Sequence, residues 1–218
     1  MEHNDKVNTV ITIGRQFGAG GRELGRKLAL ALGYDYYDKE LLAEASRQAG
    51  IGEEFFERND ERLPSLLSRG FIPFTFGMSA YSFYAGDSTI SADNLRRAQC
   101  DFIASLPQAG PCVIVGRSAD YILRDHPCLV SVFLSAPMES RVRRIISRQP
   151  GISEGKARQL AEKTDRLRSS YYNFYTDGAW GVASTYHLCF DTSRLSTDDI
   201  VALIVEYVNR RFGLKERS

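Results

Sequence analysis

The stretch ITIGRQFGAGGRELG, residues 11–25, constrains the fold of this chain more than any other feature. The β-branched residues at 7–13 predict a buried strand that ends at Gly14, and the apolar residues at 24–32 predict a helix that Gly33 ends. A glycine-rich turn between a strand and a helix gathers backbone N–H groups around one point, beside the positive end of the helix dipole. The turn therefore predicts an anion site, although a turn that only packs the helix on the sheet would carry the same glycines.

Predicted strands and helices alternate along the rest of the chain. Further strands are expected at residues 34–37, 112–116, 129–136 and 186–190. Further helices are expected at residues 39–49, 94–106 (ending before Pro107), 137–149, 153–172 and 197–212. This alternation predicts an α/β fold with a five-stranded parallel sheet and helices on both faces.

Length and composition bound the class of protein. A chain of 218 residues with 43% hydrophobic residues and a net charge of +1 is expected to form a single domain with an insertion. Its four cysteines are scattered without metal-site spacing, which favours a reducing compartment. The first residues lack the apolar core of a signal peptide, and no apolar run is long enough to cross a membrane. We therefore expect a cytoplasmic protein with no membrane partner.

One segment breaks the alternation. Residues 63–87 have no clean period, and aromatic residues concentrate at 71–84, inside an expected insertion at about residues 50–92. Such a segment fits core or subunit-interface packing, which would allow a homo-oligomer. It also fits a mobile flap over an acceptor site, because long irregular loops are often functional, and plain disorder is a third reading.

The glycine-rich turn departs from the standard phosphate-binding motif G-x-x-x-x-G-K-[ST]. With Gly20 in the sixth position, Arg15 stands where the motif has its first glycine. Gly21 replaces the lysine and Arg22 replaces the serine or threonine. The lysine that normally contacts the phosphates is therefore missing.

Four ordered blocks nevertheless resemble the cytidylate kinase-like family, a divergent branch of the nucleoside monophosphate kinases with the P-loop fold. The blocks are ITIGRQFGAGGRELGRKLALALGYDYYDKELL, CVIVGRSADYIL, VFLSAPMESRVRRI and KTDRLRSSYYNFY. Ordinary cytidylate kinases read approximately I-T-I-D-G-P-x-G-A-G-K-G-T-L in the first block, so their lysine falls on Gly21 and their threonine on Glu23. The divergent branch has R-Q-x-G-x-G-G-R-E instead, which this chain follows. The resemblance implies a P-loop nucleoside-kinase fold with a helical lid at about residues 141–176.

The resemblance also implies how a donor ATP would be held. The residues expected at its phosphates are Arg15, Gly18, Ala19, Gly20, Gly21, Arg22, Glu23 and Arg141. The side chains expected to act in catalysis are Arg22, Arg144 and Arg148. Arginine is always charged and makes forked contacts, so Arg22, or Arg15 from the entry to the loop, could supply the charge of the missing lysine.

On the acceptor side the motif is partly kept. Ordinary cytidylate kinases carry D-G-R-D in the third block, where this chain keeps Gly116 and Arg117 but has Val115 and Ser118 in place of the acids. Arg117 looks like the acceptor-phosphate arginine, although a surface arginine after a strand is the plainer reading. Asp38 could equally cap the next helix. The expected acceptor-binding residues are Asp38, Lys39, Arg117, Asp120 (a possible substitute acid), Asp165 and Arg168.

Basic residues dominate the expected lid. Residues 141–168 contain nine lysines and arginines against three acids, which would create a positive field over a phosphate site. A solvated helix pair with salt bridges is the alternative. Nucleic acid is an unlikely partner because no recognition module accompanies the patch.

The leading hypothesis is ATP-dependent phosphoryl transfer to a small acceptor, most simply CMP or dCMP. The alternative is a nucleotide-binding regulator without turnover, which the altered loop favours. Mg²⁺ is expected as a cofactor, but its usual hydroxyl and strand-end acid are missing, so its ligands are unknown. The kept acceptor and lid blocks favour the kinase.

Overall fold

The computed structural model describes residues 8–38 and 92–213 of the chain. The chain divides into two compact units, residues 1–39 with 105–218 and residues 40–104. Lys39, the helix expected at 39–49, nearly all of the expected insertion and the aromatic segment 71–84 lie outside the described residues. The single-domain organisation therefore stays a prediction.

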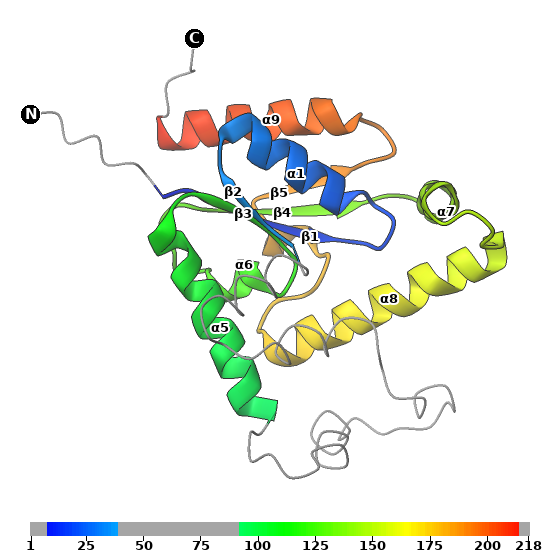
Figure 1. The fold of residues 1–218 in the computed structure, drawn as a ribbon, viewed down its shortest axis with the longest axis horizontal. Helices are drawn as coiled ribbons and strands as arrows, with labels where there is room; N and C mark the ends of the chain where they lie inside the picture. Colours follow the sequence, from blue (N-terminus) through cyan, green and yellow to red (C-terminus); the bar gives the residue numbers. More distant parts are fainter. Residues whose placement is uncertain (1–7, 39–91, 214–218) are drawn as a thin grey trace, which may run out of the picture. The chain divides into compact units, whose positions relative to one another are not determined.

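The first unit is built on a parallel sheet of five strands, as the sequence predicts (Figure 1). The strand order is β2-β3-β1-β4-β5, so β1 lies at the centre between β3 and β4. Because β1, β3 and β4 are almost wholly buried, their sequences read as continuous apolar runs. The strands are β1 Val10–Arg15, β2 Asp35–Tyr37, β3 Cys112–Val115, β4 Leu129–Ser135 and β5 Leu188–Asp191.

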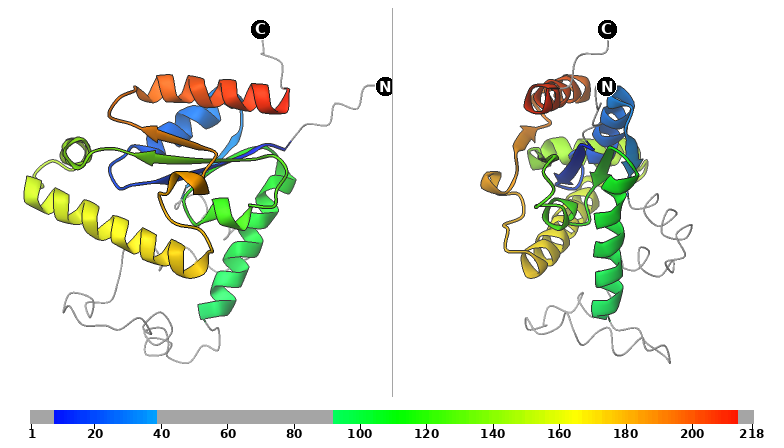
Figure 2. Two further views of the ribbon diagram at one scale, coloured as in Figure 1. Left: turned by 180° about the vertical axis from the view of Figure 1, so that it is seen from behind. Right: turned by 90° about the vertical axis from the view of Figure 1, so that its left-hand side faces the viewer.

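Helices cover both faces of this sheet. Figures 1 and 2 show α1 and α9 side by side on one face, with α6 and α8 on the other. Residues of β1, such as Ile11 and Ile13, pack in one buried cluster with Leu28 of α1 and Ile204 of α9. The described helices are α1 Gly21–Leu32, α5 Ala92–Ala109, α6 Ala119–Ile122, α7 Met138–Arg148, α8 Glu154–Tyr175 and α9 Thr197–Phe212, with a short 3₁₀ turn η2 at Ala183–Thr185. None of these helices is long and apolar enough to cross a bilayer.

Among the differences from the sequence-based expectation, two concern element boundaries and one is an additional helix. Strand β1 does not end at Gly14 but continues through Arg15, whose backbone pairs with Leu134 of β4. Helix α5 does not stop before Pro107, because a proline in the last turn removes only one N–H group from the helix. Helix α6 was not expected at all, since four residues carry no readable period.

Helices α7 and α8 form the helical pair expected as a lid. Val142 and Ile145 of α7 pack against Ala157 and Ala161 of α8. Ser153 caps the start of α8, as predicted, by accepting a hydrogen bond from the Lys156 N–H.

In parallel α/β sheets ligands bind outside the carboxyl ends of the strands. In this sheet that edge carries the β1–α1 loop, the β3–α6 turn and the start of α7.

Candidate functional site

The loop from Arg15 to Gly21 joins the central strand to α1. Gly18 and Gly20 have a left-handed backbone, with φ of 82° and 90°, which glycine adopts without strain. Gly21 does not need positive φ, because it is the buried first residue of α1. Among the described residues, no group accepts a hydrogen bond from the backbone N–H of Gly20 or Gly21. The start of α1 therefore presents donors that an anion can use.

A largely buried ion pair contacts the backbone of the first half of this loop. The Asp165 carboxylate accepts a hydrogen bond from the Phe17 N–H at 2.6 Å and from Arg141 Nη1 at 2.5 Å. Arg141 also donates to the carbonyl oxygens of Phe17 and Ala136, and its side chain is 6% exposed. Arg141 and Asp165, expected at the donor phosphates and at the acceptor, thus face each other and the loop backbone. We call this arrangement the Arg141–Asp165 clamp.

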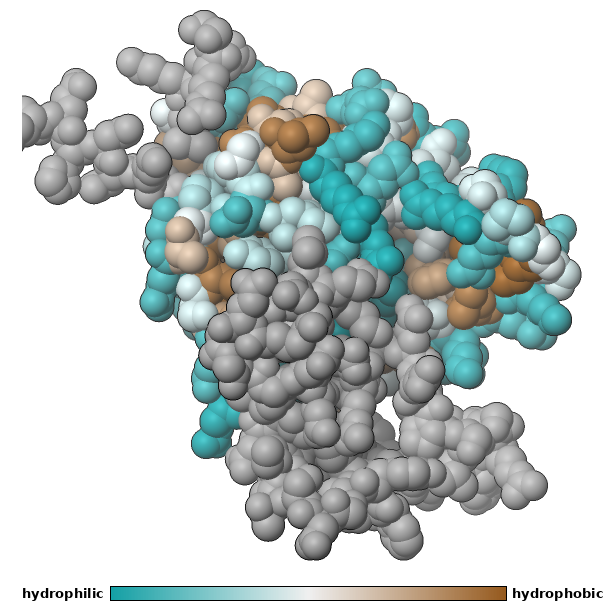
Figure 3. Space-filling model, viewed as in Figure 1, coloured by the Kyte–Doolittle hydropathy of each residue, from teal (hydrophilic) through white to brown (hydrophobic). Residues whose placement is uncertain are grey.

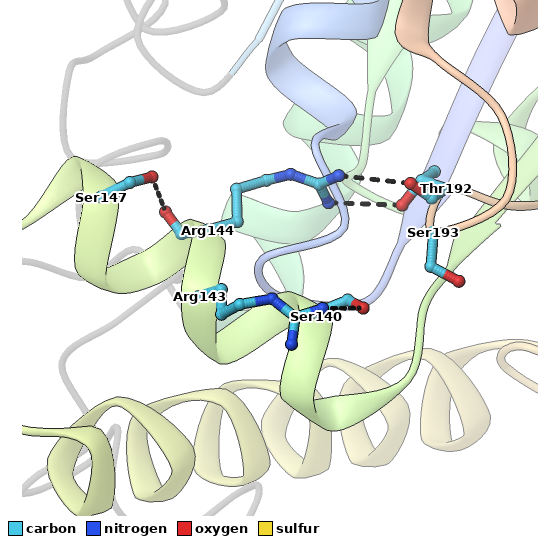
Figure 4. Close-up of a pocket in the computed structure, with 6 residues that line it drawn as sticks. All are labelled: Ser140, Arg143, Arg144, Ser147, Thr192 and Ser193. Atoms are coloured by element: carbon cyan, nitrogen blue, oxygen red, sulfur yellow. Dashed lines mark hydrogen bonds between the residues drawn. The ribbon is translucent and has the colours of Figure 1, made fainter.

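Arg144 lies over the glycines of the loop. Its Nη1 donates to the Gly18 carbonyl oxygen at 2.7 Å, and its guanidinium also contacts Thr192 (Figure 4). Partial burial, together with the nearby charge of Arg148, lowers the pKa of Arg144 from its ordinary value. An anion at the loop would offset this cost.

Beside Arg144 lies a polar pocket of about 420 Å³. Figure 4 shows its walls, which come from α7 and from the segment after β5. Sequence reasoning missed the second wall, although polar residues that directly follow a predicted strand were a usable signal. The lining residues are Ser140, Arg143, Arg144, Ser147, Thr192 and Ser193.

Arg22 points away from the loop, toward the end of β2. Its Nε lies 3.9 Å from Asp38 Oδ2, and the same oxygen accepts hydrogen bonds from Arg26 and from the Tyr36 hydroxyl. Asp38 is 1% exposed, so its carboxylate needs these partners. Arg22 and Asp38, expected at the donor and the acceptor, therefore meet each other.

The Arg15 side chain lies at the start of α1, against two glycines. A Cβ atom on Gly21 would lie 2.9 Å from Arg15 Cγ, and a Cβ atom on Gly116 would collide with Arg15 Nη1. The side chain therefore runs from the end of β1 across the start of α1 to the end of β3. Arg168 of α8 approaches from the other side, with Nη1 3.4 Å from the Arg15 carbonyl oxygen and its guanidinium over the Phe17 ring. Arg168 and Asp165 thus share one face of α8, as their spacing predicts.

Acids neutralise part of the positive field expected of the lid. Arg148 pairs with Glu23 at 2.7 Å, and Arg158 pairs with Glu139 at 3.4 Å. Glu23 also accepts a hydrogen bond from Thr197 Oγ1 at 3.4 Å. Figure 3 shows a largely hydrophilic surface from the middle of α1 to α7. The surface is polar there, but its net charge is smaller than the count of basic residues suggests.

Three consecutive residues after β3 have a left-handed backbone. Gly116, Arg117 and Ser118 have φ values of 85°, 62° and 52°. Such angles are uncommon outside glycine and often mark functional segments. Asp120, expected as a possible substitute for a lost acid of this motif, accepts a hydrogen bond from the Tyr172 hydroxyl at 2.6 Å.

The partly buried position of Asp120 predicts a pH-dependent stability. Burial raises the pKa of Asp120 above 3.8, although the hydrogen bond from Tyr172 partly opposes it. Ionisation of Asp120 therefore costs the folded state free energy, and this cost grows as pH rises from about 3.8 through the raised pKa. Asp120→Asn keeps an acceptor for Tyr172 but removes the charge. In urea unfolding, the stability of the variant relative to the native protein should increase with pH; a constant difference would contradict this.

The expected Mg²⁺ finds no matching set of side chains in the described part of the chain. Within residues 8–38 and 92–213, no three His, Cys, Asp or Glu side chains gather in a way that could hold a metal. The strand-end position of the usual acid is Val115, which is buried, and the Glu23 carboxylate is engaged by Arg148. The described side chains therefore do not fit the usual Mg²⁺ site of a P-loop kinase.

Comparisons with known proteins agree with this geometry. A sequence model of the cytidylate kinase-like family matches residues 10–194. The cytidylate kinase of Pyrobaculum islandicum is 25% identical over 207 residues, which cover 94% of this chain and 96% of that protein. The cytidylate kinase of Pyrococcus furiosus is 24% identical over 197 residues, covering 89% and 85%.

Solved structures give the same fold. An uncharacterized protein from Eubacterium ventriosum superposes with a TM-score of 0.68 at 26% identity, covering 92% of this chain and 98% of that chain. Shikimate kinase from Bacteroides thetaiotaomicron superposes with a TM-score of 0.51 at 16% identity, with the same coverage, and this similarity concerns the fold alone. The expected P-loop kinase fold is confirmed.

Proposed function

Because this chain belongs to the cytidylate kinase-like family, we propose that it transfers the terminal phosphoryl group of ATP to a nucleoside monophosphate. CMP or dCMP is the simplest acceptor. The observation that carries the proposal is the start of α1, where the N–H groups of Gly20 and Gly21 stand open between the side chains of Arg15 and Arg144. This arrangement suits the phosphates of a nucleotide, which accept hydrogen bonds and carry negative charge.

The donor nucleoside would extend from the loop into the polar pocket. Arg144 contributes to both places, since it contacts Gly18 in the loop and Thr192 in the pocket wall. Hydroxyl groups and guanidinium groups in that wall suit the hydroxyls of a ribose. The donor would thus lie along α7 with its terminal phosphates at α1.

Arg117 and Arg168 would hold the acceptor phosphate. A guanidinium contacts phosphate with two parallel hydrogen bonds. Arg117 follows β3, and Arg168, within α8, reaches the carbonyl oxygen of Arg15 at the start of the loop. An oxygen of the acceptor phosphate would attack the γ-phosphorus as the bond from that phosphorus to the β–γ bridging oxygen breaks, giving ADP and a nucleoside diphosphate. Arginines around the transferring group would stabilise its charge and position both substrates.

A nucleotide-binding regulator is the second candidate. The observation that favours it is the loss of three residues that kinases use, replaced by Gly21, Glu23 and Val115. A regulator would bind ATP in the same loop but would not hold an acceptor next to it.

A linked dinucleotide separates the two candidates without relying on turnover. Adenosine joined to cytidine through five phosphates fills a donor and an acceptor site at once, so a kinase should bind it at least about 100-fold more tightly than ATP in calorimetric titration. Arg166→Ala, on the exposed face of α8, should behave as the native protein does. Equal affinity for ATP and the linked dinucleotide would instead support the regulator.

A further inference from the structure

The charge of the missing lysine has two candidate sources in the sequence, and the structure separates them. The Arg22 side chain is 53% exposed and lies at Asp38, which also takes Arg26 and Tyr36. Asp38 is buried, so moving Arg22 toward the loop would remove one of the cations near that carboxylate. Arg22 is therefore held on the β2 side of α1.

Arg15 starts from a fixed base. It is the last residue of the central strand, and its backbone pairs with Leu134 of β4. Side chains two residues apart along a strand share a face, so Arg15 lies on the same face as Ile11 and Ile13. Those two residues pack against α1, and Arg15 is therefore aimed at the start of α1.

Two glycines make room for the Arg15 side chain. At Gly21 a Cβ atom would lie within 3.3 Å of Arg15 Cβ, Cγ and Cδ, so any larger residue there would displace the arginine. At Gly116 a Cβ atom would overlap the guanidinium. The guanidinium thus lies beyond Gly21, at the end of β3, beside the turn that carries Arg117.

We propose that Arg15 is the cation that contacts the terminal phosphates of the donor, in place of the P-loop lysine; this inference rests on the proposed nucleotide-binding function. Gly21 and Arg15 together replace the lysine and the first glycine of the standard motif. The lysine side chain is absent because the arginine occupies its place from the neighbouring strand. Gly116 completes the arrangement by leaving space for the head of the arginine.

Calorimetric titration of the full chain with ATP, ADP and AMP tests the proposal. Arg15→Ala should weaken the binding of ATP and ADP by about 10- to 100-fold, the scale of one charge-assisted hydrogen bond, and AMP much less. Arg15→Gln, which keeps most of the packing, should do the same. Arg22→Ala is the matched control and should change ATP affinity by less than about threefold, because the Arg22 side chain lies at Asp38 and not at the loop.

Exchange of the two positions gives the sharpest test. Gly21→Lys alone should weaken ATP binding, because the new side chain collides with Arg15. Gly21→Lys combined with Arg15→Ala should recover at least part of the ATP affinity that Arg15→Ala loses, since the lysine then has space. Thermal unfolding of each variant checks that it is folded.

Three results would overturn the assignment. They are an equal or larger effect of Arg22→Ala, an equal loss of AMP and ATP affinity in Arg15→Ala and Arg15→Gln, and no recovery in the combined variant. Failure of the kinase proposal has a different signature, because ATP would then bind and depend on Arg15 while every monophosphate stayed unconverted. A native chain that does not bind ATP would overturn both.

Discussion

Arg117→Ala is expected to lower kcat/KM for the monophosphate acceptor by at least about 100-fold, because it removes a forked, charge-assisted contact to the acceptor phosphate. ATP affinity should stay nearly unchanged, since the donor loop is built from other residues. Arg117 follows β3 in a left-handed turn, which fixes its backbone at the edge of the sheet where the donor loop lies. Steady-state kinetics with varied acceptor, together with titration of ATP, measures both quantities.

A second variant separates this role from backbone strain. At a φ of 62° a residue with a Cβ atom costs the fold about 1–2 kcal/mol, and glycine does not. Arg117→Gly should therefore lose turnover as Arg117→Ala does, without losing stability through strain. Arg124→Ala, at an exposed position after α6, should retain turnover. Normal turnover in Arg117→Gly would show that the arginine does not hold the acceptor.

Arg141→Ala should lower the free energy of unfolding by about 3–5 kcal/mol, the usual cost of removing one partner of a buried ion pair. The substitution leaves the Asp165 carboxylate without its strongest cation, and it leaves the carbonyl oxygens of Phe17 and Ala136 without a donor. Urea unfolding measures the change. Arg143→Ala, two residues along α7 and exposed, should change stability by less than about 0.5 kcal/mol.

A paired substitution tests whether the cost of Arg141→Ala comes from the charge that it leaves unpaired. Arg141→Met combined with Asp165→Asn removes both charges while keeping similar volume and an acceptor for the Phe17 N–H. This variant should recover much of the stability that Arg141→Ala loses, because no unpaired charge remains. If Arg141→Ala costs less than about 1 kcal/mol, the typical effect of any substitution, the pair is not the buried clamp described above.

The middle of the sheet could be predicted because β1, β3 and β4 are buried on both faces. Residues 112–116 and 129–136 are largely apolar runs of strand length, a pattern typical of strands in the interior of a parallel sheet. The end of β1 could not be located this way. Gly14 resembles a strand terminator in sequence, but a Cβ atom there would lie 2.8 Å from the Phe133 ring, so the glycine serves close packing inside the sheet.

The sequence predicts which residues belong to the site more readily than which residues they contact. Arg141 and Asp165 belong to motif blocks that suggested separate donor and acceptor roles, and their contact depends on how α7 and α8 fold back on the loop. Which of Arg15 and Arg22 lies near the glycine-rich loop likewise depends on Asp38, because its carboxylate pairs with Arg22 at the end of β2. Such choices are made by tertiary packing, which the local sequence does not specify.

The conversion of nucleotides tests the kinase proposal most directly. The purified chain is incubated with Mg-ATP and CMP, and the products are separated by anion-exchange chromatography. We predict CDP and ADP in equal amounts, with little ADP when CMP is omitted and a large loss of both products in Arg15→Ala and Arg117→Ala. Binding of ATP with CMP, dCMP and every other monophosphate left intact would contradict the proposal and leave a nucleotide-binding regulator with a kinase fold.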